Sequence, residues 1–167
     1  MKKSFSIILT VSVFAFSTSL LAESITMNIT AEHGSGAPAG EVQITKTKYG
    51  LLLTPNLKGL TPGIHGFHVH EKASCDDNGM AAGGHFDPKR TNKHLGPYND
   101  NGHLGDLPVI YVEANGSAIT PVMAPRLTSL DSIKNHALMV HHDGDNYSDT
   151  PQKLGGGGTR MACGIIS

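Results

Sequence analysis

The segment at residues 66–71 reads Gly-Phe-His-Val-His-Glu and alternates apolar side chains with histidines. That alternation has the two-residue period of a β-strand, whose successive side chains point to opposite faces. Phe67 and Val69 would then enter a hydrophobic core. His68 and His70 would lie side by side on the outer face, close enough to bind one metal ion. The segment therefore predicts a strand rather than a helix, with two imidazoles displayed together.

Other short apolar segments, separated by Gly, Pro, Asn and Asp, predict further strands. The expected strands are residues 25–29, 42–44, 51–53, 67–70, 107–113, 118–122, 137–142 and 161–166. Eight strands with turn-rich connections predict an all-β fold, an eight-stranded antiparallel Greek-key flattened barrel or immunoglobulin-like sandwich. The sequence has no internal repeat and no sign of a second domain.

Two connections are too long to be simple turns: residues 72–105 and 143–159. Loops longer than about 12 to 15 residues without secondary structure of their own are usually functional or disordered. Metal coordination can supply the order that a missing core cannot. The second connection contains glycines 155–158, which we expect to pack closely as backbone lining a site beside Arg160. Both connections are therefore predicted to be functional loops.

The first long loop carries His85, His94 and His103 at intervals of nine residues, with Asp106 three residues after the last. In a Gly-rich loop, metal binding explains this regular spacing of imidazoles better than a purely structural role does. Imidazole nitrogen suits copper and zinc, and three histidines with one carboxylate match a tetrahedral zinc set. The loop therefore predicts a metal site.

A later apolar run at residues 137–140 ends at His141, which could approach the face of His68 and His70 if the run is a strand. Seven candidate ligands are then available for two four-coordinate ions: His68, His70, His85, His94, His103, Asp106 and His141. One of these residues must therefore bind both ions. The spacing leaves the grouping open, because the available imidazoles are His68, His70, His85, His94, His103, His136, His141 and His142. The more isolated histidines are expected to be ordinary residues: His33, His65, His136 and His142.

Six motifs occur in a fixed order along the chain: GFHVHE at 66–71, GGHFDP at 83–88, HLGP at 94–97, GHLGDLP at 102–108, VH at 140–141 and GGGTRMACG at 156–164. In this order they resemble the copper/zinc superoxide dismutases, above all the bacterial periplasmic branch. The resemblance covers essentially the whole chain after residue 22, and the set of motifs is very specific.

The resemblance implies one copper ion and one zinc ion per subunit. The copper ligands would be His68, His70, His85 and His141. The zinc ligands would be His85, His94, His103 and Asp106. His85 would then bridge the two metals as an imidazolate, and Asp145 would hydrogen-bond ligands of both metals and fix their orientation, with Asp143 as a nearby competitor.

The implied activity is conversion of superoxide into dioxygen and hydrogen peroxide by copper that alternates between Cu(II) and Cu(I). On reduction, His85 would leave copper and take up a proton that helps to form peroxide. Arg160 would dock the superoxide anion beside copper. The alternative is a periplasmic copper/zinc-binding protein without turnover, which an intact ligand set with an anion-docking arginine disfavours.

The chain has two cysteines, Cys75 and Cys163, and an even count in an exported protein predicts a disulfide. The bond would tie the first long loop to the last strand. The resemblance implies the same pairing.

Residues 1–22 are expected to be a signal peptide, with Lys2 and Lys3 before an apolar run at 7–16 and cleavage near Ala22 and Glu23. The uninterrupted apolar run is shorter than the ~20 residues that a membrane-spanning helix needs. We therefore expect a periplasmic protein whose single domain spans residues 23–167, with no membrane contact after the signal is removed.

The charge of the mature chain excludes other classes of partner. Without Lys2 and Lys3, 11 basic residues face 14 acidic residues, a net charge of −3 with neutral histidine. Neither a basic stripe for nucleic acid nor a basic amphipathic helix for a membrane surface occurs in the sequence. The expected partner is therefore the small superoxide anion, attracted locally. The sequence leaves both a monomer and a homodimer open.

Overall fold

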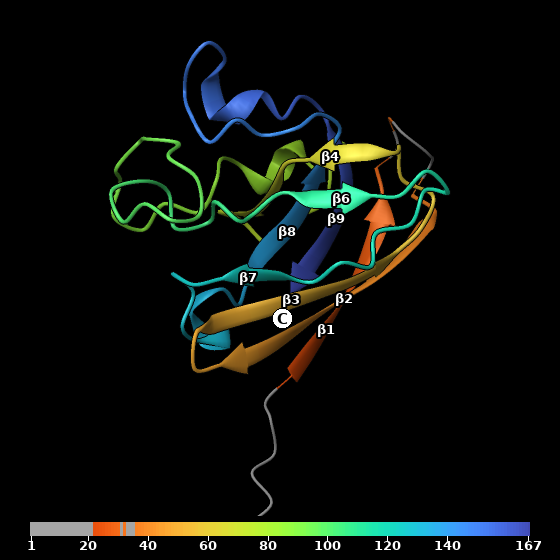
Figure 1. Cartoon of the computed structure of the whole chain (residues 1–167), viewed down its shortest axis with the longest axis horizontal. Helices are drawn as coiled ribbons and strands as arrows, with labels where there is room; N and C mark the ends of the chain where they lie inside the picture. Colours follow the sequence, from red (N-terminus) through yellow and green to blue (C-terminus); the bar gives the residue numbers. More distant parts are fainter. Residues whose placement is uncertain (1–21, 31, 33–35) are drawn as a thin grey trace, which may run out of the picture.

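The structure is a computed structural model and describes residues 22–30, 32 and 36–167. The expected signal peptide, except Ala22, and His33 lie outside these residues. The described residues form nine strands (Figure 1): β1 Ala22–Ile29, β2 Pro38–Thr47, β3 Gly50–Leu57, β4 Gly63–His65, β5 Phe67–His70, β6 Ile110–Val112, β7 Val122–Ala124, β8 His136–His141 and β9 Arg160–Ile166. Three short 3₁₀ helices span Met80–Ala82, Leu130–Ser132 and Lys153–Gly156. None of the helices in this described part has the length and apolar character needed to cross a membrane.

All strand pairs in the described residues are antiparallel, which confirms the expected all-β fold. Seven strands form one sheet in the order β5-β8-β9-β1-β2-β3-β7, and β4 pairs with β6 in a second sheet. The large sheet curls into a half-barrel (Figure 1). Because the last strand, β9, lies between β8 and β1, the C-terminal part of the chain is held in the middle of the sheet.

Alternating side chains on the strands build the core inside the curled sheet. In β2 and β3, Val42, Ile44, Leu51 and Leu53 are fully buried, while their neighbours along each strand are polar or more exposed. The turn between these strands requires Gly50, since its φ is +124° and a Cβ there would lie 2.4 Å from the carbonyl oxygen of Ala124. The two-residue period thus explains both the sheet and the core.

The structure differs from the eight expected strands mainly at three places, and proline accounts for two of them. The expected strand at 107–113 is limited to Ile110–Val112, following Pro108. The expected strand at 118–122 is only a bridge between Leu57 and Ala118, and β7 begins after Pro121. Proline has no N–H to donate to a sheet. The third, β4, is too short to give a periodic signal and exposes Ile64.

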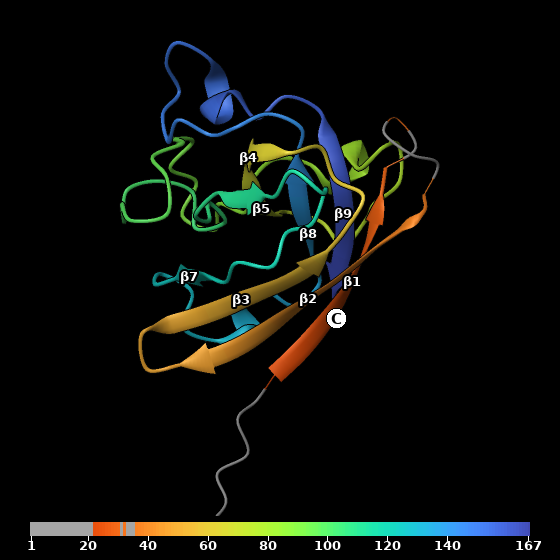
Figure 2. The ribbon, with the colours of Figure 1, turned by 45° about the vertical axis from the view of Figure 1, so that its right-hand side comes forward.

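In the structure the first long loop spans residues 71–109, between β5 and β6, and the second spans 142–159, between β8 and β9. The two loops lie at the same end of the half-barrel and cover the outer face of β5 and β8 (Figures 1 and 2). A disulfide joins Cys75 of the first loop to Cys163 of β9, which confirms the predicted bond. Phe67 and Val69 are buried in the core as predicted. His68 and His70 lie on the opposite face, but the loops cover them. Only 0% of His68 and 1% of His70 is exposed.

Candidate metal centre

Strand pairing brings the first three histidines together. In the antiparallel register of β5 and β8, Phe67 pairs with Val140, so His141 follows directly beside the start of β5. The Nε2 atoms of His70 and His141 lie 3.2 Å apart. The predicted approach of His141 to the histidines of β5 is therefore present in the fold.

The first long loop returns along the free edge of β5 and adds two more candidate ligands. Bridges join His70 to His85 and His68 to Asp106. The Val69 peptide accepts the N–H of Phe86 at 2.8 Å and donates to Gly105 at 2.9 Å. Gly105 is needed here, since a Cβ would lie 2.2 Å from the carbonyl oxygen of Val69. Pairing with the free edge of β5 thus fixes the backbone around His85 and around Asp106.

The first cluster contains four buried histidines whose candidate ligand atoms all lie within 4.8 Å of one another: His68, His70, His85 and His141. Burial, followed by the neighbouring imidazoles, lowers the pKa of His68 and His70 well below its usual value. The same causes lower the pKa of His141 to about 4. At neutral pH these rings are therefore uncharged and have lone pairs available for a metal.

Hydrogen bonds on the far side of each ring determine which nitrogen is bare. His70 Nδ1 lies 3.0 Å from the carbonyl oxygen of Gly83, which can only accept, so the ring proton resides there and Nε2 is bare. His68 Nε2 donates to Asp145 at 2.8 Å, and His68 Nδ1 has no hydrogen-bond partner among the described residues. Bare nitrogens that converge in a buried site are repulsive without a cation and match a copper donor set.

The second cluster surrounds one carboxylate oxygen. Its candidate ligand atoms also lie within 4.8 Å of one another and come from His85, His94, His103 and Asp106. Asp106 Oδ1 lies 2.9, 3.1 and 3.3 Å from the Nδ1 atoms of His85, His94 and His103, respectively. Burial opposes ionisation of Asp106, but hydrogen bonds from His103 and His85 and the contact with His94 outweigh it and hold its pKa far below the usual range. Three imidazoles with one ionised carboxylate fit tetrahedral zinc.

His85 belongs to both clusters. Its Nδ1 lies beside Asp106 in the second cluster, which leaves Nε2, across the ring, for the first. Burial lowers the pKa of His85, although hydrogen bonding to Asp106 opposes the shift. The two clusters are therefore joined through a single imidazole, as the count of seven candidate ligands requires.

Asp145 links the clusters a second time. Its two carboxylate oxygens accept the Nε2 protons of His68 and His94, each at 2.8 Å. Burial disfavours a charged His94, but Asp106 and Asp145 outweigh burial and raise its pKa to about 9. The atoms of His68, His94 and Asp145 also lie within 4.8 Å of one another, yet hydrogen bonds account for both contacts. Asp143, the competing carboxylate, instead contacts His142.

His94 Nδ1 is the second buried nitrogen without a hydrogen-bond partner among the described residues. It lies 3.1 Å from Asp106 Oδ1, close enough for a charge interaction but without hydrogen-bond geometry. Because Nε2 of the same ring donates to Asp145, Nδ1 is the atom left to bind a metal once it has lost its proton.

Arg160 begins β9 and lies half-buried beside the first cluster. Its Nη1 donates to the carbonyl of Gly79, and its Nη2 donates to that of Gly83 at 2.5 Å. The same Gly83 oxygen accepts the proton of His70 Nδ1. The charge of Arg160 also helps to lower the pKa values of His70 and His141. The guanidinium is therefore held within electrostatic reach of the copper-type cluster.

The glycine run packs against the site, as expected. A Cβ on Gly155 would lie 1.9 Å from Asp145 Oδ1 and 2.8 Å from His94 Nε2. A Cβ on Gly157 would lie 3.2 Å from the side chain of His141. Glycine therefore allows the second loop to approach the ligands closely.

Three residues outside the expected set also hold the loops. Tyr147 accepts the N–H of Val109 at 3.0 Å through its hydroxyl, and Asp149 accepts the N–H of His94 at 2.9 Å. Arg126 donates to several carbonyls of the first loop. Each is a single polar residue outside any periodic motif, so the sequence carried no signal for it.

Residues 38–166 match the copper/zinc superoxide dismutase family. The chain belongs to this family. A superoxide dismutase [Cu-Zn] from Photobacterium leiognathi is 47% identical over 99% of this chain and 99% of its own length. The solved copper/zinc superoxide dismutase from Brucella abortus is 46% identical, covers 88% of this chain and 100% of its own, and has a TM-score of 0.83.

A second solved member, the monomeric copper, zinc superoxide dismutase from Salmonella enterica, is 52% identical. The match covers 88% of this chain and 100% of that chain, with a TM-score of 0.76. The predicted family is thereby confirmed for nearly the whole described chain.

Proposed function

We propose that this protein is a superoxide dismutase that converts two superoxide anions and two protons into dioxygen and hydrogen peroxide. One observation carries the proposal. The bare ring nitrogens of His68 and His70 converge in a buried site, and His85 joins that site to a second cluster built on Asp106. Family membership supports the same activity.

The donor sets assign the metals. Four imidazoles of the first cluster would hold copper: His68, His70, His85 and His141. Three imidazoles and a carboxylate would hold zinc: His85, His94, His103 and Asp106. Copper, when bound, supplies reversible one-electron exchange with superoxide, whereas zinc has no redox chemistry. The zinc cluster would therefore order the loop and orient His85.

His85 is the residue suited to deliver a proton. Asp106 remains beside Nδ1, so the ring keeps its orientation whether or not Nε2 carries a proton. Because burial lowers the pKa of His85, a proton held at Nε2 is readily given up. Peroxide needs two protons, and His85 Nε2 can hold one of them at the first cluster.

Arg160 would bind the anion. Two backbone carbonyls, of Gly79 and Gly83, fix its guanidinium. A guanidinium has five N–H donors and remains charged, so donors are left for superoxide. The mature chain has a net charge of −3, which makes a local cation necessary to attract an anion.

We further propose that the protein is exported to the periplasm after removal of residues 1–22, leaving one domain at 23–167. The disulfide between Cys75 and Cys163 supports an oxidising compartment, and the bacterial relatives fit the same location. Both proposed metal sites lie within one subunit, so the activity requires the same residues in a monomer and in a homodimer.

The test is metal content and superoxide decay measured on the same purified mature protein. We expect copper and zinc near one each per chain, rapid decay of superoxide, and one peroxide for every two superoxide anions consumed. His141→Ala should lose copper and activity but retain zinc, and Asp106→Asn should chiefly lose zinc. The neighbouring His142→Ala is the matched control and should keep both metals. Tight copper binding without turnover would instead identify a metal carrier.

A further inference from the structure

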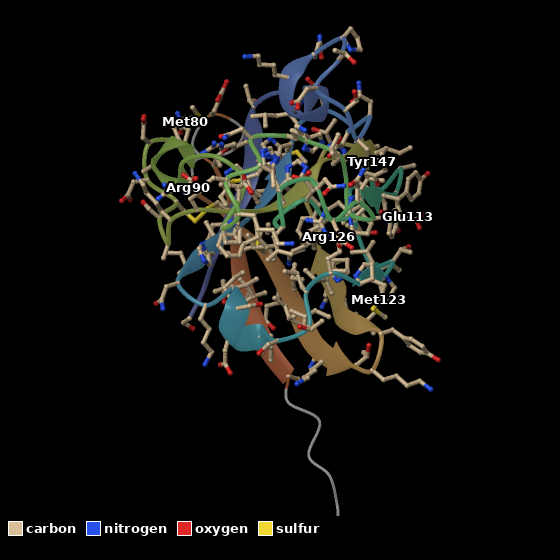
Figure 3. The ribbon with its side chains drawn as sticks, turned by 90° about the vertical axis from the view of Figure 1, so that its left-hand side faces the viewer. Met80, Arg90, Glu113, Met123, Arg126 and Tyr147 are labelled. Carbon is tan, nitrogen blue, oxygen red and sulfur yellow. A yellow bond between two sulfur atoms is a disulfide. The ribbon has the colours of Figure 1, made fainter. Side chains whose placement is uncertain are left out.

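Arg126 lies outside both clusters, in the connection that follows β7, and reaches the loop that carries His94 and His103. Figure 3 labels it where the barrel strands meet the green loops above them. Its two terminal nitrogens donate to four backbone carbonyls: Nη1 to Gly96 at 3.2 Å and to Asn99, and Nη2 to Gly102 at 3.4 Å and to His103. One side chain thus holds a loop segment that contains a proposed zinc ligand.

The charge of Arg126 is compensated by these carbonyl dipoles. No carboxylate of the described residues lies within ion-pair distance of it. A guanidinium is planar and presents several N–H groups in a fixed fork, so it can hold several acceptors in one arrangement. A lysine in its place would keep the charge but lose the fork.

Arg126 holds residues 93–103, and hydrogen bonds within this segment join its two ends. The His103 N–H donates to the carbonyl of Lys93 at 2.9 Å, and a turn joins Gly102 N–H to Asn99 at 3.2 Å. Arg126 contacts carbonyls within this closed segment, including that of His103 itself. The backbone of His103 is therefore fixed to the barrel wall through one guanidinium.

The other members of the second cluster have different supports. Bridges to β5 hold His85 and Asp106, while Asp145 and Asp149 hold the ring and the peptide of His94. His103 is the most exposed member, at 7%. Its backbone is held by the closed segment, by Arg126 and by the Asp106 N–H, which donates to the His103 carbonyl at 3.4 Å.

We propose that Arg126 is a positioning residue for zinc, which sets the backbone of His103 before the metal enters and slows release of the metal afterwards. The inference rests on the assignment of zinc to the second cluster. Arg126 acts only through the carbonyls of the loop and contacts none of the four proposed copper ligands, so its direct effect falls on zinc.

The experiment compares three variants of the full mature protein: Arg126→Ala, Arg126→Lys and Leu127→Ala. Leu127 is the buried neighbour in the barrel core, so its truncation lowers the thermal midpoint without removing a hydrogen bond to the loop. Zinc affinity and dissociation are followed by competition with a chelator. We expect about tenfold weaker binding and faster loss for Arg126→Ala, an intermediate effect for Arg126→Lys, and no change for Leu127→Ala.

A spectroscopic readout separates positioning from fold stability. Cobalt(II) placed in the zinc cluster reports ligand geometry through its visible absorption. The spectrum should change in Arg126→Ala, recover partly in Arg126→Lys and match the parent in Leu127→Ala. Copper affinity, measured with zinc in saturating excess, should be unchanged in all three. If Arg126→Ala does not fold, Arg126→Lys alone still supplies the test.

Two results would overturn the inference. One is zinc release from Arg126→Ala at the parental rate. The other is zinc loss that follows the thermal midpoint equally in Arg126→Ala and Leu127→Ala. Failure of the zinc assignment is recognised separately, because Asp106→Asn would then bind zinc as tightly as the parent.

Discussion

In three of the proposed ligand histidines the two ring nitrogens have separate functions, and the proposed site depends on that division. In His68 and His94, Nε2 donates to Asp145 and Nδ1 is left for a metal. In His70, Nδ1 donates to a carbonyl and Nε2 is left. In His68 and His70 the fixed partner selects the tautomer before any metal arrives, which reduces the cost of ordering the rings on binding. In His94, whose pKa is raised to about 9, Nδ1 must first lose its proton.

Stability of the metal-free protein should depend on pH in two directions. Burial lowers the pKa of His141 to about 4, so stability is lost as pH falls from 6.5 to 4, where only the unfolded chain readily binds the proton. His94 has its pKa raised to about 9, so its contribution is complete below 6.5 and lost as pH rises through 9. Urea midpoints should therefore peak near pH 6.5.

His94→Gln is the control for the basic limb of this profile. It should remove most of the loss between pH 6.5 and 9 and keep the loss between 6.5 and 4. A midpoint in the parent that rises steadily from pH 6.5 to 9 would contradict the ion pairing of His94 with Asp106 and Asp145.

Arg160→Ala should slow superoxide decay by roughly ten- to several-hundred-fold while both metals stay bound. A charge ~4 Å from the anion is worth about 1 kcal/mol in water and about 4 kcal/mol at an effective dielectric of 20. Arg160→Lys should be milder, since it retains the charge, and Arg160→Glu should be worse. Rates are measured at low and high salt, and salt should slow the parent more than Arg160→Ala. Equal rates for all four proteins at low salt would assign Arg160 an ordinary surface role.

Candidate ligands lie along both edges of strand β5. β8 supplies His141 on one side, and the first loop supplies His85 and Asp106 on the other. The second loop then covers the cluster, since Asp145, Tyr147 and Asp149 contact residues of the first loop. The two loops are therefore expected to order together.

Tyr147→Phe should lower the stability of the metal-free protein by about 1 kcal/mol. The change removes the acceptor of the Val109 N–H and leaves that partly buried donor unpaired. Tyr98→Phe, which alters a 71% exposed tyrosine of the first loop, is the matched control and should have no effect. Denaturant unfolding measures both. Equal stability of the two variants would show that the hydroxyl contact is dispensable.

The sequence predicted what periodicity and motif order can encode. It identified β5, the pairing of Cys75 with Cys163 and the two groups of candidate ligands. It missed β4, whose three residues give no periodic signal, and the covering of His68, because burial by a distant loop leaves no local pattern. Arg126 and Tyr147 were missed for the same reason, since their partners lie 23 or more residues away along the chain.

In the whole molecule, the half-barrel supports the site, and the two long loops cover one end of it (Figure 1). The disulfide and the strand order hold β9, and hence Arg160, beside β8. The fold thereby brings residues from position 68 to position 160 into one site. We propose that this site holds two different metals that share His85.

Anomalous X-ray diffraction from crystals of the metal-loaded protein, recorded at the copper and zinc edges, locates each metal separately. We predict a copper peak among His68, His70, His85 and His141, and a zinc peak among His85, His94, His103 and Asp106. His85 should lie between the two peaks. A single peak, or a metal between His68, His94 and Asp145, would contradict the account.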